Sequence, residues 1–186
     1  MSDAMFEHLR QFPTIIVTGP HRSGTTICAE MIAHDTGHTT IREEAYGFKN
    51  LRKFMWLILW TRVAKLPVVI QAPAMFHRLR LFGRLPGTAV VLMRRPLDEL
   101  REARGRMYGV NGSKLSQEEQ NKEELGWLGS DSGDAAEVKY RLWERWKRHV
   151  RNPFEVTYSD LADHPLWVPT DVRRGAGRKW HNRRIA

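Results

Sequence analysis

The chain has 186 residues, a length that fits one domain with a full hydrophobic core. Its single cysteine, Cys28, excludes an intrachain disulfide, and its most apolar stretch, Phe54 to Leu66, is shorter than the roughly 20 residues that span a bilayer. Because residues 1–10 also lack a secretory signal, we expect a cytoplasmic protein. The net charge of +9 favours anionic partners without choosing among nucleotides, nucleic acid and acidic lipids.

Strand and helix patterns alternate along the first half of the chain. Thr14 to Thr18 is a short β-branched apolar run, which predicts a buried strand. From Gly24 to about Asp35 apolar residues recur at helical spacing, and Gly37 follows as a stop signal. A second helix is predicted from Phe48 to Lys65, before a proline at position 67.

The same alternation continues in the second half. It predicts further strands at Pro67–Gln71, Thr88–Met93 and Phe154–Tyr158, and helices at Met75–Phe82, Pro96–Met107, Gln117–Leu125 and Ala135–Val150. Residues 111–134 are polar, which predicts a mobile insertion, and residues 171–186 form a basic tail. Apolar strands alternating with helices are typical of an α/β protein. We therefore expect one domain over residues 1–186, with three layers and a central, mainly parallel sheet.

A glycine-containing loop joins the first strand to the first helix. Residues 19–26 read Gly-Pro-His-Arg-Ser-Gly-Thr-Thr, the spacing of a Walker A loop except that Thr25 stands at the lysine position. Its glycines let backbone N–H groups turn inward, and the helix adds its partial positive end. The pattern therefore predicts an anion-binding loop in which Arg22 is the available cation. A strand-to-helix turn without a ligand is the alternative interpretation.

The Arg-Ser-Gly-Thr-Thr run resembles the phosphosulfate loop of P-loop sulfotransferases, above all the tyrosylprotein and bacterial forms. The resemblance implies a P-loop NTPase-like fold and transfer of a sulfuryl group from 3′-phosphoadenosine-5′-phosphosulfate to a hydroxyl or amine of a small molecule or peptide, without a metal. It also implies that the sulfuryl end is bound by Gly19, Arg22, Ser23, Gly24, Thr25 and Thr26.

Later segments follow in the order of the same family. Arg94-Arg95-Pro96-Leu97-Asp98 resembles the segment that binds the 3′-phosphate, which implies a contact from Arg94, with Arg95 as the alternate. Residues 173–180 are similar to the family's C-terminal nucleotide loop, which implies contacts from Arg174 and Gly175. Weaker resemblances in the right order are Gln71-Ala72-Pro73 and Thr157-Tyr158-Ser159-Asp160-Leu161.

Three further residues are candidates for catalysis beside Arg22. Glu43 and Glu44 resemble the acidic pair of tyrosylprotein sulfotransferases, in which one glutamate is the base. A carboxylate can take a proton if burial raises its pKa, although paired loop acids are usually solvated. His21 lies within the loop, where it is a second candidate base. We favour for it a hydrogen bond to the bound anion.

Two other functions stay open. A small-molecule kinase would use a nucleoside triphosphate and magnesium, and Thr25 at the lysine position argues against it. An inactive anion-binding module of the same fold is favoured by Glu102 and Gln71, which replace a serine and a lysine of the family. Trp143 and Trp146 lie among arginines, but at helical spacing we expect core residues rather than a nucleic-acid surface. The sequence predicts neither the acceptor nor the oligomeric state.

Overall fold

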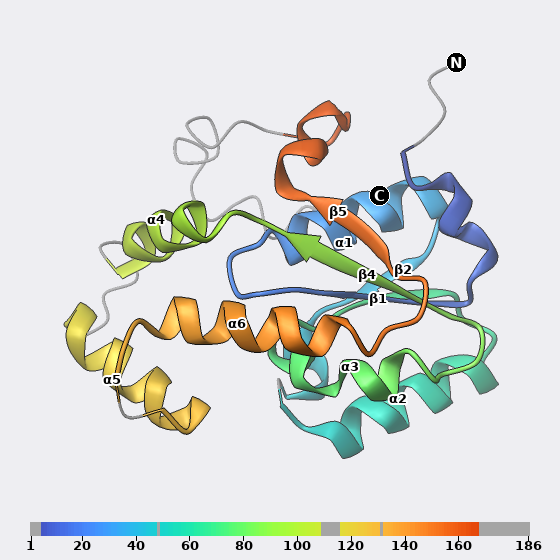
Figure 1. The fold of residues 1–186 in the computed structure, drawn as a ribbon. Coiled ribbons are helices and arrows are strands. Elements are labelled where there is room, and N and C mark those ends of the chain that lie inside the picture. Colours follow the sequence, from blue (N-terminus) through green and yellow to red (C-terminus); the bar gives the residue numbers. More distant parts are fainter. Residues whose placement is uncertain (1–4, 48, 109–115, 131, 168–186) are drawn as a thin grey trace.

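A parallel five-stranded sheet forms the centre of the protein, with the strand order β2-β3-β1-β4-β5 (Figure 1). The computed structural model describes residues 5–47, 49–108, 116–130 and 132–167. Every neighbouring pair of strands runs parallel. The strands are β1 (Thr14–Thr18), β2 (Thr39–Ile41), β3 (Val68–Gln71), β4 (Thr88–Arg94) and β5 (Phe154–Thr157).

Helices cover both faces of the sheet, as Figure 1 shows. The α-helices are α1 (Thr25–Thr36), α2 (Leu51–Val63), α3 (Leu79–Phe82), α4 (Leu97–Tyr108), α5 (Gln117–Leu128) and α6 (Ala135–Lys147). Short 3-10 helices are η1 (Glu7–Gln11), η2 (Glu43–Tyr46), η3 (Pro73–Arg78) and η4 (Tyr158–Asp163). Within these described residues, no helix combines the length and the hydropathy needed to cross a bilayer.

The alternation of side chains along β1 divides the core into two clusters. Ile16 faces the cluster formed with α2, α3 and α6, whereas Ile15 and Val17 face the cluster formed with α1, η1 and η4. Trp143 is 1% exposed in the first cluster, as the sequence predicts, and Cys28 is fully buried in the second. The predicted α/β architecture of three layers around a parallel sheet is thereby confirmed.

Several elements differ in extent from their predicted ranges. Strand β2 was not predicted, because it has three residues, two of them threonine, and pairs with β3 alone. The helix predicted at 75–82 divides into η3, which begins at Pro73, and the single turn of α3. Part of the predicted insertion forms α5, whose capping box at Ser116 fixes its start. Residues 109–115, residue 131 and the tail at 171–186, which contains Arg174 and Gly175, lie outside the described residues.

A buried carboxylate joins both ends of the described chain to α1. Asp35 accepts hydrogen bonds from the Phe6 backbone N–H at 3.0 Å and from His164 Nε2 at 3.1 Å. His164 Nδ1 accepts the Leu166 N–H at 3.0 Å, so Nε2 must carry the proton that it donates. His34 Nδ1 adds a third contact at 3.0 Å. This cluster fastens the segments before β1 and after β5 to the end of α1.

We predict that Asp35→Asn destabilises the protein in a pH-dependent way. Burial alone would raise the pKa of Asp35, but the hydrogen bonds from His34, Phe6 and His164 hold it below its ordinary value. A carboxyl group whose pKa is lower in the folded than in the unfolded protein stabilises the fold at any pH above its unfolded-state pKa. This stabilisation is lost as the pH falls through the folded-state pKa. The variant should lose about 1–3 kcal/mol of unfolding free energy at neutral pH and lose less in acid. Urea unfolding at neutral and acidic pH measures both losses, and Asp163→Asn, at an exposed position, is the control. An equal loss of stability at all pH values would contradict the stabilising role of the ionised Asp35 carboxylate.

Candidate functional site

The loop between β1 and α1 lies at the carboxyl edge of the sheet. The N-cap of α1 is Gly24, which has no side chain to cap the first-turn N–H groups, so these groups are left to solvent or a ligand. The preceding turn is closed by a hydrogen bond from Ser23 N–H to the Pro20 carbonyl at 3.1 Å. The Ser23 hydroxyl is buried and has no hydrogen-bond partner among the described residues. Anion binding by this loop stays a prediction, with which the uncapped N–H groups are compatible.

Close packing explains why the loop has glycine at two positions. A Cβ on Gly19 would lie 2.5 Å from the Ser23 Oγ and 2.9 Å from the Met93 carbonyl oxygen. A Cβ on Gly24 would lie 2.5 Å from the ring of Tyr158, and the φ of this glycine is 92°. Neither position has room for a larger residue.

Arg95 and Tyr158 brace the loop from outside. The Arg95 Nη1 donates to the Arg22 carbonyl at 2.9 Å, which holds Arg22 at its left-handed φ of 73°. The Arg95 guanidinium also stacks 3.9 Å from the centre of the Tyr158 ring, which itself packs against Trp167. In this structure Arg95 therefore supports the loop.

Arg94 has a different partner. Its guanidinium forms an ion pair with Glu155 of the neighbouring strand at 2.9 Å, and its side chain is half exposed. Binding of a 3′-phosphate by Arg94 or Arg95 stays a prediction. For Arg94 such binding requires the phosphate to compete with Glu155 or to join that pair.

The lysine position of the Walker pattern and the end of β3 form one small cluster. Thr25 is 5% exposed. The Gln71 Nε2 donates to Thr26 Oγ1 at 2.9 Å and lies 3.5 Å from Thr25 Oγ1. Tyr46 fixes this strand end by donating its hydroxyl to the Gln71 carbonyl at 2.8 Å. A neutral amide and two hydroxyls therefore occupy the place where a Walker loop has its lysine.

The structure separates the two acids that the sequence could not tell apart. Glu43 is half-buried; its Oε2 has no hydrogen-bond partner among the described residues, while the carboxylate accepts a hydrogen bond from the Ala74 backbone N–H. Burial raises the pKa of Glu43 and the charge of Glu44 adds to this, against the opposing effects of Ala74 and Arg22. Glu44 itself is exposed. Of the two acids, Glu43 is thus the one that is partly buried and whose pKa is affected by the charge of Arg22.

The loop histidine is neutral at physiological pH. Although part of His21 is open to solvent, the protein around its ring removes water, and repulsion from Lys139, Arg22 and Lys49 adds to this effect. Together they lower the pKa of His21 to about 4, against an opposing contribution from Glu124. A neutral imidazole can donate a hydrogen bond to an anion, as predicted, or accept a proton. The cations that act on it make the loop electropositive.

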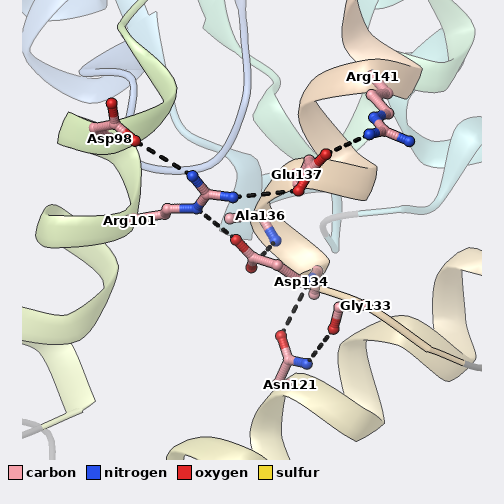
Figure 2. A network of polar contacts seen from close by, with 9 residues as sticks. Asp98, Arg101, Asn121, Gly133, Asp134, Ala136, Glu137 and Arg141 are labelled. Carbon is pink, nitrogen blue, oxygen red and sulfur yellow. Dashed lines mark hydrogen bonds and ion pairs between the residues drawn. The ribbon is translucent and has the colours of Figure 1, made fainter.

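Helices α4, α5 and α6 lie beside this site as one group. Lys139 of α6 pairs with Glu124 of α5 at 2.8 Å. Figure 2 shows that Arg101 of α4 reaches across to α6, pairing with Asp134 at 2.6 Å and with Glu137 at 3.2 Å. The effect of Lys139 and Glu124 on His21 was not foreseen, because the polar segment containing α5 gave no sequence signal of where it packs.

One group among the described residues has the composition of a metal site. Ligand atoms of His34, Asp35 and His164 lie within 4.8 Å of one another. However, both ring nitrogens of His164 are committed, Nδ1 to the Leu166 N–H and Nε2 as a donor to Asp35. The cluster also lies at the end of α1 remote from the loop. Its geometry is explained by the hydrogen bonds that fasten the chain.

Comparisons with known proteins identify the fold. No family model and no curated protein matches the chain. Among solved structures, shikimate kinase from Acinetobacter baumannii in complex with shikimate is 12% identical, with a TM-score of 0.50 over 97% of this chain and 99% of that one. YorR protein from Bacillus subtilis in complex with phosphorylated GDP is 11% identical, with a TM-score of 0.47 over 90% and 98%. A gluconokinase from Sinorhizobium meliloti 1021 is 18% identical, with a TM-score of 0.40 over 80% and 85%.

The first of these likenesses carries the assignment. Together with the parallel sheet and the loop after β1, it shows an α/β fold of the P-loop NTPase type. At 12% identity the likeness shows the fold and leaves the activity to be argued from the site.

We predict that Gly24→Ala abolishes anion binding at the loop whereas Gly37→Ala does not. Both glycines flank α1 with positive φ, 92° and 74°, but only the added methyl at Gly24 meets a side chain, the ring of Tyr158. Both variants should lose about 1 kcal/mol of stability or more from backbone strain. Calorimetric titration with pyrophosphate should detect binding in the wild type and in Gly37→Ala only. Equal binding by both variants would mean that the anion site lies elsewhere.

Proposed function

We propose that this protein is a group transferase that holds the anionic end of a nucleotide donor at residues 19–26 and activates its acceptor with Glu43. One observation carries the proposal: the half-buried Glu43 carboxylate has an oxygen without a hydrogen-bond partner among the described residues, and burial raises its pKa against the opposing charge of Arg22. A partly buried carboxylate oxygen without a hydrogen-bond partner lowers the stability of the fold, and such groups are often retained because they bind or activate a ligand. Its place beside the P-loop supports a role in taking a proton from an acceptor.

Two donor chemistries compete. The likeness to a solved shikimate kinase supports a small-molecule kinase better than it supports a sulfotransferase. A kinase of this fold would need a cation at the terminal phosphates and carboxylates to help hold magnesium. Here the lysine position is a buried threonine, and β1, β3 and β4 end on Thr18, Gln71 and Arg94.

These residues favour sulfuryl transfer as the chemistry. Because the residues of a site, rather than its fold, determine the reaction, we propose 3′-phosphoadenosine-5′-phosphosulfate as the donor. The resemblance of residues 19–26 to the phosphosulfate loop supports the same donor. A sulfuryl group can be transferred without a metal, since first-turn N–H groups, hydroxyls and Arg22 can offset the charge of the leaving phosphate.

The proposed step is a direct displacement. The acceptor oxygen bonds to sulfur while the bond between sulfur and the bridging phosphate oxygen breaks, which releases 3′-phosphoadenosine-5′-phosphate. The acceptor proton passes to Glu43. The first-turn N–H groups of α1, which Gly24 leaves uncapped, would offset the charge that develops on the leaving oxygen.

We predict that 3′-phosphoadenosine-5′-phosphate binds without magnesium and more tightly than ATP with magnesium. Calorimetric titration of the wild type measures both, and Arg22→Ala should weaken binding of the favoured nucleotide by about tenfold or more, the value of a charge-assisted contact. The matched control is Arg141→Ala, which removes an exposed α6 arginine. A clear preference for ATP with magnesium would assign the kinase chemistry. Binding of neither nucleotide would leave the inactive anion-binding module.

We predict that Glu43→Gln slows transfer by about 10²- to 10⁴-fold, the usual contribution of a general base, and leaves nucleotide binding nearly intact. Glu44→Gln is the matched control, since the neighbouring acid is exposed. Because burial raises the pKa of Glu43, wild-type turnover should rise with pH through a pKa above the ordinary glutamate value, and Glu43→Gln should lose this rise. Turnover with labelled donor and a mixed pool of hydroxyl acceptors measures both effects. If the two variants behave alike, the base lies elsewhere and His21 is the next candidate.

A further inference from the structure

Helix α2 presents large apolar side chains to solvent. Trp56, Leu59, Trp60 and Val63 are 65%, 61%, 48% and 77% exposed. Their spacing of three, one and three residues places them on one helix face, over about 10 Å of its length. The opposite face buries Phe54 and Ile58 in the core. The helix is therefore apolar on two sides, of which only one is needed for folding.

The surface around this face is positively charged. Between Ala45 and Leu97 the sequence contains no aspartate or glutamate. Helix α2 packs beside α3 through Phe54 and Phe82, whose ring centres are 5.1 Å apart, and both helices lie on the same side of the sheet (Figure 1). The exposed basic residues within or next to these two helices are Arg52, Lys53, Lys65, Arg78, Arg80 and Arg84.

Charge selects among the possible occupants of the α2 face. A second copy of the chain would bring two basic rims together, and the tail at 171–186 is itself basic, so both are opposed by repulsion. An anionic surface is attracted instead. Two tryptophans with aliphatic neighbours and flanking lysine and arginine are the composition of a helix that lies in a membrane interface, where indole rings sit at the headgroup boundary.

We propose that the α2 face docks the protein on an anionic lipid bilayer, with α2 in the plane of the interface. Trp56, Leu59, Trp60 and Val63 enter the headgroup region, while Arg52, Lys53 and Lys65 contact lipid phosphates. The mode is peripheral, because α2 has only 13 residues. The inference does not depend on the donor chemistry of the loop.

The test is binding to vesicles. Wild-type protein should cosediment with vesicles of phosphatidylglycerol and phosphatidylcholine in equal parts, with a blue shift of tryptophan fluorescence, and should bind pure phosphatidylcholine weakly. Trp56→Ser/Trp60→Ser should bind at least about tenfold more weakly. Arg52→Ser/Lys53→Ser should weaken binding mainly at low salt. The matched control Lys122→Ser/Arg141→Ser removes two exposed charges from α5 and α6 and should bind like the wild type.

Three results would overturn the proposal. The first is a wild type that binds neither kind of vesicle, which would favour an acidic protein as the partner. The second is unchanged binding by Trp56→Ser/Trp60→Ser, with folding confirmed by circular dichroism. The third is a dimer, seen by sedimentation velocity without lipid, that the double tryptophan variant abolishes, since this would assign the face to a second copy.

Discussion

The packing of Tyr158 against Gly24 is the contact on which the site depends. It brings the segment after the last strand against the loop after the first, and it supplies the ring on which Arg95 stacks. From there Arg95 reaches the Arg22 carbonyl and holds that residue in a conformation that non-glycine residues rarely adopt. The loop is thus held by residues that follow β4 and β5, which makes its open N–H groups available before any ligand arrives.

Charge at the site follows from this rigid loop. Loss of water around its ring lowers the pKa of His21, and repulsion from Lys139, Arg22 and Lys49 adds to this effect. The same arginine also favours a lower pKa for Glu43, but burial and the charge of Glu44 outweigh it and the Ala74 hydrogen bond, so the pKa of Glu43 rises. A site with cationic groups at the donor end and a proton acceptor beside it suits transfer of an anionic group to a hydroxyl.

The sequence predicts those parts of the structure that depend on neighbouring residues. Four strands and the turn between β1 and α1 were predicted because β-branched runs and glycine spacing are local signals, whereas β2, with its three residues, gives almost none. The role of Arg95 could not be foreseen, because its partner Arg22 is 73 positions away. Nor could Glu43 be chosen over Glu44, since the choice depends on how η2 packs against Ala74.

The two departures from the expected motifs turn out to be one feature. Thr25 stands at the lysine position of the Walker A pattern, and Gln71 stands where the sulfotransferase family has a lysine. From the sequence alone, these are two independent substitutions, typical of a site that has lost its activity. In the structure the Gln71 amide contacts the hydroxyls of Thr25 and Thr26, so these groups have partners. Among the described residues, the buried side-chain atoms near the loop that lack a hydrogen-bond partner are instead Ser23 Oγ and Glu43 Oε2. In a site that had lost its activity, we would not expect Thr25 and Gln71 to be hydrogen-bonded while the polar atoms of Ser23 and Glu43 stay without partners. The arrangement therefore favours an enzyme over an inactive module.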